Sequence, residues 1–274
     1  MTEHRLVKPG DPTYPAGLFD LEEPPSLYVL GQTTTAPAVA VVGTRRCTRY
    51  GLSLAEGFGR ALAQAGWTTV SGLARGIDAS AHRGTLGGRG EAVAVLGSGI
   101  DVVYPAENRE LYHSIVAGAG AVISEYPPGT PPDRWRFPAR NRLIAAIASA
   151  VVVVEASNKG GALITARLAA ELGRPVFAVP GDVDRAASVG CNLLIRDGAI
   201  PALGVEDLIE ELQLVLGKPP RSPEPAIGDI PATGVALDDL PGIWGCAPAE
   251  ALARLARMEV AGEIRRSGDR VVPI

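Results

Sequence analysis

Cysteine and histidine, on which many catalytic and metal sites depend, are scarce in this sequence of 274 residues. The three cysteines lie far apart and form no CxxC pair, which argues against a zinc ribbon and a disulfide framework. The three histidines form no HExxH or HxH cluster. We therefore expect neither a bound metal nor a catalytic triad built on histidine.

Long apolar runs are also missing. The longest nearly apolar run, residues 143–154, is too short to cross a bilayer, which needs about 20 residues. The beginning of the sequence lacks the apolar stretch of a secretory signal. We expect a soluble, cytoplasmic protein that makes no contact with membranes.

Lysine is rare: 23 of the 26 basic residues are arginine, and the net charge is −4. This charge argues against a generally basic surface. Genome base composition is a sufficient reason for the arginine bias, but the arginines also cluster. Residues 44–49 hold three with no acid, and residues 133–142 hold four with one acid. Such segments on an acidic protein predict a confined site for an anion.

Short apolar runs rich in β-branched residues recur along the chain, at residues 39–42, 68–70, 92–96, 121–123, 151–154 and 175–179. Near-continuous apolar runs are typical of strands covered on both faces. Helical patterns lie between them, for example at residues 52–65 and 163–172. This alternation predicts an α/β fold, an extended Rossmann-like, doubly wound and mostly parallel sheet over residues 37–216.

Proline marks the flanks of this predicted domain. Residues 1–36 are punctuated by proline, and we interpret them as an N-terminal connector or strap laid on the core. Residues 217–236 begin with a proline-rich stretch and form a predicted linker. Residues 237–274 contain a helix opening at Pro248 and a hairpin around residues 267–269. They predict a reduced winged-helix-like domain or, equally, a small docking appendage.

In a doubly wound sheet, ligands bind at the carboxyl ends of the strands. Those ends are rich in Gly, Ser and Arg here, at residues 43–46, 71–76, 97–101, 124–127 and 155–161. Small residues let backbone N–H groups face an anion, and arginine supplies forked donors. The shared ligand is therefore predicted to carry phosphate. We expect Arg45 and Arg140 to reach this cleft as exposed side chains that contribute little to folding stability.

Two common classes of phosphate site are disfavoured. The first strand–helix turn, Gly43-Thr44-Arg45, lacks the GxGxxG pattern of a dinucleotide site. The only Gly-Lys pair, residues 217–218, is followed by proline rather than by the Ser or Thr of a P-loop. We expect no cofactor.

Several residues of these loops also have plain structural interpretations. The glycines suit tight turns, and His82 suits a buried helical position. Glu125 and Glu155, at strand ends, suit the orientation of arginines as well as acid–base chemistry. Trp135 and Phe137 suit either a core position or, because arginines are interleaved with them, stacking on bases.

Several segments together resemble the DNA-processing protein A family (DprA/Smf). They are residues 39–45, 71–82, 96–105, and 137–144 with 160–166, within a match from about Tyr14 to Ala202. The resemblance implies an extended Rossmann domain that binds single-stranded DNA, forms homodimers and carries out no catalysis. It also implies a role in natural transformation and recombination, in which the protein protects incoming single-stranded DNA and helps load the RecA recombinase.

Carried over by motif, the resemblance also gives candidate DNA-binding residues. They are Arg45, Arg46, Ser71, Gly72, Arg75, Asn108, Arg109, Arg140, Asn141, Arg142, Lys159, Gly160 and Gly161. The chain departs from the family in two places: only the connector of an N-terminal helical domain is present, and the C-terminal segment lacks the first helix of a winged helix. If that segment is a reduced winged helix, its arginines are candidate contacts to double-stranded DNA, namely Arg254, Arg257, Arg265, Arg266 and Arg270.

The main alternative is an enzyme on the same sheet, a nucleotide-processing hydrolase resembling the phosphoribohydrolases of the lysine-decarboxylase-like group. Those enzymes carry Pro-Gly-Gly-x-Gly-Thr-x-x-Glu at a strand end. Residues 159–165 and their neighbours lack the proline, the third glycine at the required place and the glutamate. A pure scaffold for partner proteins would leave the phosphate-type loops unexplained.

Overall fold

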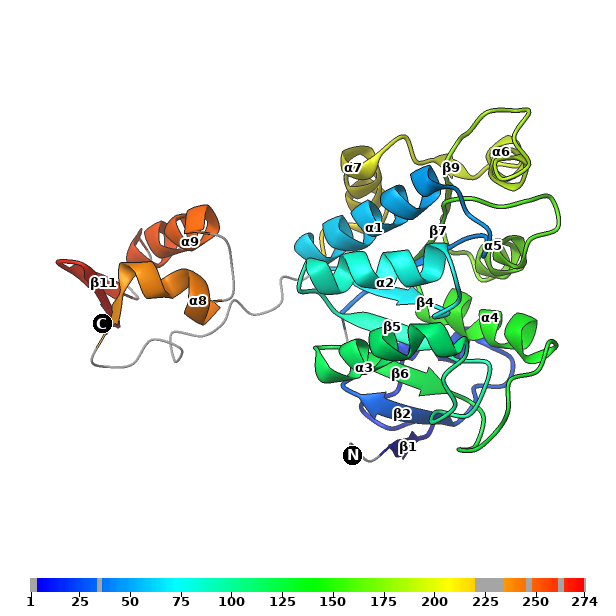
Figure 1. Ribbon diagram of the computed structural model, residues 1–274, viewed down its shortest axis with the longest axis horizontal. Coiled ribbons are helices and arrows are strands. Elements are labelled where there is room, and N and C mark those ends of the chain that lie inside the picture. Colours follow the sequence, from blue (N-terminus) through cyan, green and yellow to red (C-terminus); the bar gives the residue numbers. More distant parts are fainter. Residues whose placement is uncertain (1–3, 34–35, 220–233, 245–247, 261–263, 274) are drawn as a thin grey trace. The chain divides into compact units, whose positions relative to one another are not determined.

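The computed structural model describes residues 4–33, 36–219, 234–244, 248–260 and 264–273. The chain divides into two compact units, residues 1–220 and 221–274 (Figure 1). Each unit has its own sheet and its own hydrophobic core.

The first unit is built on a nine-stranded sheet with the strand order β1-β2-β6-β5-β4-β3-β7-β8-β9. The strands are β1 (Arg5–Val7), β2 (Leu27–Gly31), β3 (Ala38–Val42), β4 (Thr68–Ser71), β5 (Ala92–Val95), β6 (Ala121–Ser124), β7 (Ala150–Val153), β8 (Val176–Ala178) and β9 (Ile200–Pro201). The pairs β1–β2 and β2–β6 are antiparallel, and all other neighbours in the sheet are parallel. The predicted mostly parallel α/β sheet is confirmed, since β3 to β8 coincide with the six apolar runs.

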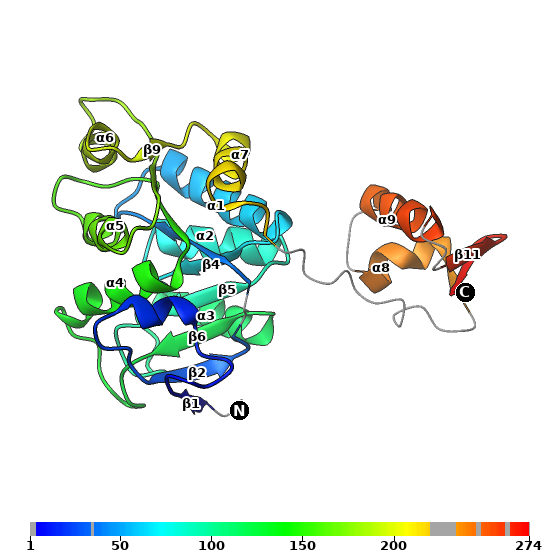
Figure 2. The ribbon, with the colours of Figure 1, turned by 180° about the vertical axis from the view of Figure 1, so that it is seen from behind.

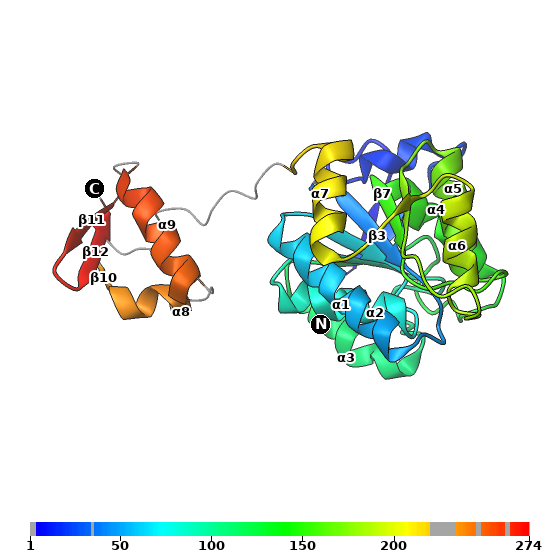
Figure 3. The same ribbon diagram turned by 90° about the horizontal axis from the view of Figure 1, so that it is seen from above.

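Helices cover both faces of this sheet (Figures 2 and 3). One face carries α1 (Arg49–Gln64), α2 (Ile77–Gly87), α3 (Arg109–Ala117) and α7 (Val205–Leu216). The other carries the short 3-10 helix η1 (Ala16–Asp20), α4 (Arg136–Ile147), α5 (Gly161–Glu171) and α6 (Val189–Arg196). Successive residues of a strand point to opposite faces, so a strand with both faces covered must be apolar throughout.

Strand β3 illustrates this requirement. Val39 and Val41 join the core that contains Phe58 of α1, whereas Ala40 and Val42 join the core on the α4 side. All five residues of the strand are buried. The unbroken apolar run in the sequence is thus a direct consequence of helices on both sides.

The N-terminal residues differ from the expected strap. β1 and β2 extend the main sheet beyond β6, and Leu27 and Val29 of β2 are buried. Between them, η1 packs so closely on α4 that a Cβ at Gly17 would overlap the backbone of Ala146. The prolines of this region punctuate real secondary structure, which is why composition alone suggested an irregular connector.

The second unit is a small antiparallel sheet with two helices. Its strands, in the order β10-β12-β11, are β10 (Val235–Ala236), β11 (Ile264–Ser267) and β12 (Arg270–Pro273). A 3-10 turn, η4 (Leu237–Asp239), leads into α8 (Leu240–Trp244), and α9 (Pro248–Val260) follows. The predicted helix opening at Pro248 and the hairpin at residues 267–269 are both present, whereas α8 and β10 were not foreseen.

Apolar side chains from both helices and from the hairpin form the core of the second unit. Trp244, Leu255, Ile264 and Val271 are all buried there. The side chain of Arg254 is also buried, with its guanidinium carbon 4.4 Å from the centre of the Trp244 ring. Within the described residues of the chain, no helix is long and apolar enough to span a bilayer.

Candidate nucleic-acid interface

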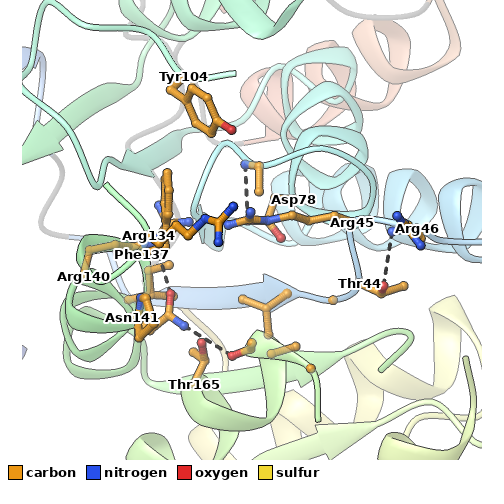
Figure 4. Close-up of a pocket in the computed structure, with 18 residues that line it drawn as sticks. Thr44, Arg45, Arg46, Asp78, Tyr104, Arg134, Phe137, Arg140, Asn141 and Thr165 are labelled. Atoms are coloured by element: carbon orange, nitrogen blue, oxygen red, sulfur yellow. Dashed lines mark hydrogen bonds between the residues drawn. The ribbon is translucent and has the colours of Figure 1, made fainter. Parts of the chain in front are cut away.

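A pocket of about 610 Å³ opens at the carboxyl ends of β3 and β7. The connections leave opposite faces of the sheet at these neighbouring strands, so this is the topological switch point where doubly wound sheets bind ligands. The volume lies in the range of roughly 300–1,000 Å³ typical of small-ligand sites. Residues from five parts of the chain line it: residues 42–46 at the end of β3, Ala74 with Asp78, Tyr104, six of the residues between 134 and 144, and four of those between 160 and 165 (Figure 4).

The loop after β3 carries two exposed arginines into this region. The Thr44 backbone N–H donates to the Glu155 carbonyl at 2.7 Å, and the Arg46 N–H donates to the Thr44 hydroxyl oxygen at 3.2 Å. These bonds fix the loop while leaving the Arg45 and Arg46 side chains exposed at the pocket. Both side chains are therefore open to solvent at the pocket, and the expected exposure of Arg45 is observed.

An aromatic wall faces Arg45. The guanidinium carbon of Arg45 lies 4.9 Å from the centre of the Phe137 ring, and the rings of Phe137 and Tyr104 are 5.4 Å apart. In Figure 4, Arg45 reaches across the pocket toward Phe137 and Arg134, below Tyr104. The pocket thus combines guanidinium groups, which suit phosphate, with aromatic faces, which suit bases.

Arg140 also lines the pocket, but it is not the exposed side chain that we expected. Only 4% of it is exposed, because α4 passes beneath the ends of β4 and β5 and carries the guanidinium into the interior. There it donates to the carbonyl oxygens of Gly72, at 2.7 Å, and of Val95. Burial lowers the pKa of Arg140 to about 10, so the side chain stays charged at neutral pH.

Asp78 supplies a buried negative charge beside Arg140. Its carboxylate accepts N–H bonds from Gly72, at 3.1 Å, and from Ala74, at 3.4 Å. Burial raises the pKa of Asp78, and the positive charge of Arg140 opposes that rise. Asp78 therefore holds the turn after β4 and balances Arg140.

The start of α5 forms the opposite side of the pocket. Gly160 is the residue that caps the helix and Gly161 is its first residue, and both line the pocket. Asn141 donates from its side-chain amide to the Gly161 carbonyl oxygen at 3.3 Å, which ties α4 to α5. No heavy atom outside the neighbouring residues lies within 4 Å of where a Cβ of Gly161 would be, so the backbone is open to a ligand there.

The thirteen predicted site residues fall into three groups. The pocket brings six together: Arg45, Arg46, Arg140, Asn141, Gly160 and Gly161. Gly72 and Arg75 border a small adjoining hollow that Arg45 and Tyr104 also line. Neither hollow is lined by the remaining five, which are Ser71, Asn108, Arg109, Arg142 and Lys159.

Three of those five have structural contacts instead. Ser71 is buried and donates to the Val41 carbonyl oxygen at 2.7 Å, and Asn108 is buried and donates to the Leu73 carbonyl oxygen at 2.9 Å. Arg142 forms an ion pair with Glu125, as the strand-end position of that acid suggests. Arg109 and Lys159 are exposed outside the pocket.

Glu155 does not orient an arginine in the described structure. Its carboxylate accepts the backbone N–H of Thr48 at 2.8 Å and the Thr48 hydroxyl, while Thr48 caps the first turn of α1. His82 is fully buried on α2, and burial lowers its pKa to about 3, which fits its interpretation as a structural residue.

Among the lining residues that sequence reasoning did not single out are Arg134, Tyr104 and Thr165. Arg134 lies in the arginine-rich segment but was not singled out, and Tyr104 ends a recognised motif without obvious chemistry of its own. Thr165 lies one turn into α5. The arginine count of residues 133–142 was the signal that could have identified Arg134.

The charge of the pocket follows from this inventory. Among the described residues that line it, four are arginines and the sole carboxylate is Asp78, whose oxygen is engaged by backbone N–H groups. No group of three or more potential metal-ligating side chains occurs in the described part of the chain. The pocket is therefore suited to a phosphate-bearing ligand with a planar base.

The chain is similar to a known family of proteins. Residues 5–213 match the family described as DNA recombination-mediator protein A. Protein Smf of Synechocystis is 44% identical over 76% of this chain, which spans 54% of that protein. DNA processing protein DprA of Bacillus subtilis is 38% identical over 73% of this chain, which spans 68% of the relative. The chain thus covers about half of the first relative and two thirds of the second.

Two solved structures have the same fold. DNA processing protein A of Streptococcus pneumoniae superposes with a TM-score of 0.71 at 38% identity, covering 76% of this chain and 74% of that one. DNA processing protein A of Helicobacter pylori, studied for its unique single-stranded DNA binding mode, gives 0.70 at 29% identity, covering 78% and 97%.

Proposed function

Because the chain belongs to the DNA recombination-mediator protein A family, we propose that it binds single-stranded DNA in natural transformation and recombination. In this role it protects incoming single strands in the cytoplasm and helps load the RecA recombinase. It acts by binding, as a homodimer, and carries out no catalysis.

One observation carries the proposal: four arginines and two aromatic rings converge on a single pocket at the switch point of the sheet. An exposed guanidinium such as that of Arg45 pairs with a phosphate through a charge-assisted fork. The rings of Phe137 and Tyr104 offer faces on which an unpaired base can stack. Bases in a duplex are already stacked on one another, so this combination favours single strands.

In the proposed site, Arg140 has a role different from that of the exposed arginines. Its guanidinium donates to two backbone carbonyl oxygens, so it shapes the wall of the pocket. Its positive charge acts on the pocket from a buried position. Direct phosphate contact falls to Arg45, Arg46 and Arg134. The backbone at Gly160 and Gly161, where α5 begins, adds N–H groups with the favourable end of the helix dipole.

The second unit is proposed to be a reduced winged helix that binds double-stranded DNA. Two helices followed by a hairpin, with β12 between β10 and β11, support this assignment. The candidate contacts to double-stranded DNA are then limited to exposed arginines of the hairpin. Arg265 and Arg270 remain, although Arg270 also donates to the Gly234 carbonyl oxygen at 2.7 Å. Arg254 is buried against Trp244, and Arg266 pairs with the carboxylate of Glu259 at 3.1 Å. The side chain of Arg257 lies outside the described residues.

Fluorescence anisotropy with a labelled single strand and the matching duplex tests the proposal, alongside an assay for base release from nucleoside monophosphates. We expect tighter binding of the single strand and no released base. Released base would favour the hydrolase alternative, and equal affinity of the first unit for single and double strands would contradict recognition of unpaired bases.

A further inference from the structure

A second cluster of aromatic and arginine side chains lies beside the pocket. Trp135 is 58% exposed, an unusual condition for so large an apolar side chain. Its ring meets that of Tyr126 edge to face, with 6.2 Å between the ring centres. The guanidinium carbon of Arg136 lies 5.0 Å from the centre of the Trp135 ring and 5.1 Å from that of Tyr126.

This cluster is distinct from the pocket yet continuous with it. Arg134 and Phe137, three residues apart, line the pocket, whereas neither Trp135, Arg136 nor Tyr126 does. Arg134 lies just before α4 and Phe137 lies in its first turn, and the two residues between them belong to the cluster. The same short segment of chain therefore contributes side chains to both the pocket and the cluster.

The loop that carries the cluster is held in place before any ligand arrives. The Gly99 N–H donates to the Thr130 carbonyl at 2.8 Å, and the Gly129 N–H donates to the Asp101 carboxylate at 2.7 Å. Arg136 itself donates to the Pro131 carbonyl oxygen. Because the loop is held in this way, little backbone freedom is lost when a base stacks on a ring that it carries.

We propose that Trp135, supported by Arg136 and Tyr126, is a second stacking platform that binds an unpaired base of the same strand whose phosphates engage the pocket. The proposal rests on the proposed function. Three features of the segment favour a nucleic acid as the occupant: an exposed ring, an adjacent guanidinium, and four arginines against one acid over residues 133–142. An aromatic platform suits any base, since every base has a π-face.

Tryptophan fluorescence tests the platform directly. The chain has three tryptophans, of which Trp67 is 2% and Trp244 is 8% exposed, so a strand that stacks on a tryptophan must quench Trp135. Titration with a long oligothymidylate should quench the emission of the full chain. Trp135→Phe should remove most of the quenching while it retains most of the affinity, since a phenyl ring still stacks.

Anisotropy of the labelled oligothymidylate gives an independent measure of binding. Trp135→Ala should weaken binding roughly 5- to 150-fold, the span expected for loss of one stacked base. Phe19→Ala is the matched control, because Phe19 is 53% exposed on η1, beside Tyr14 rather than the pocket, and should leave the affinity unchanged.

The outcomes separate this proposal from the proposed function. If the oligothymidylate binds but leaves the emission unchanged, and Trp135→Ala keeps the affinity, the platform is wrong and the pocket stands. If the oligothymidylate does not bind at all, both are wrong. Should Trp135→Ala fail to fold, the quenching lost in Trp135→Phe decides the question.

Discussion

The Arg140 guanidinium donates to the carbonyl oxygen of Gly72 across 2.7 Å, in a space where Gly72 could carry no side chain. The same group bonds the Val95 carbonyl oxygen, so one arginine ties together the ends of β4 and β5. The motif predicts a free DNA ligand at this position, whereas the arginine is built into the wall of the pocket.

Replacing Arg140 should therefore lower the free energy of unfolding. Arg140→Ala leaves two buried carbonyl oxygens without a donor and Asp78 without its balancing charge. We expect a loss of about 3–5 kcal/mol in the free energy of unfolding, the range for removing one member of a buried charge pair. Urea denaturation measures it, with Arg45→Ala expected within about 0.5 kcal/mol of the parent. If Arg140→Ala were as stable as Arg45→Ala, Arg140 would not contribute to the stability of the fold.

Two glycine variants separate folding from binding. Gly72→Ala places a methyl group against the Arg140 guanidinium and should cost roughly 1–3 kcal/mol of stability. Gly161→Ala meets no neighbour within 4 Å, so the fold should tolerate it. Its methyl group would instead stand where the backbone faces the ligand, and single-strand affinity should fall. Thermal melts and anisotropy check the pair; a stable Gly72→Ala protein would contradict the close approach.

Stability should decline as pH falls below neutrality because of His82. The pKa of this buried imidazole is lowered to about 3, mainly by burial, from an ordinary value of 6.5. Between these values the unfolded chain takes up a proton that the folded chain does not, so the free energy of unfolding falls by about 1.4 kcal/mol per pH unit.

Urea titrations at several pH values from about 7 to 4 measure this slope. His82→Gln should make this slope shallower by the contribution of one proton, about 1.4 kcal/mol per pH unit. The same change at His113, whose side chain is exposed, is the control and should leave the slope as it was. An unchanged slope in His82→Gln would mean that His82 accepts its proton in the folded state.

The sheet could be predicted from the sequence because burial on both faces leaves a local mark. The run at residues 150–153 is apolar at every position, and every one of those side chains is buried. No comparable local mark shows that Arg140 is buried: its environment is made by Gly72 and Val95, far away in sequence.

The site was predictable to the extent that it consists of loops at strand ends. Arg45 and Gly161 reach the pocket because parallel strands bring their carboxyl ends to one edge. The roles of Ser71 and Asn108 could not be read in this way, since their hydrogen bonds go to distant backbone carbonyls. Motif membership identifies a residue as needed, without saying whether the fold or the ligand needs it.

Deleting the chain after Lys218 tests the second unit. If the hairpin arginines contact duplex phosphates, the deletion should weaken duplex binding and leave single-strand binding nearly intact. Mobility shifts with both kinds of oligonucleotide measure this. Equal loss of both activities would mean that the second unit supports the main site or its fold.

The most direct test of the central claim, that a single strand binds through its phosphates at the pocket, is the salt dependence of binding by Arg45→Ala. Affinity for a single strand is measured by anisotropy between about 50 and 200 mM salt, for the parent, Arg45→Ala and the control Arg60→Ala, whose arginine pairs with Glu56 on α1. We predict weaker binding by Arg45→Ala and a slope of log affinity against log salt that is shallower by about 0.7, one phosphate contact. Arg60→Ala should match the parent. An Arg45→Ala protein that folds, binds normally and keeps the parent slope would contradict the account and place the DNA elsewhere.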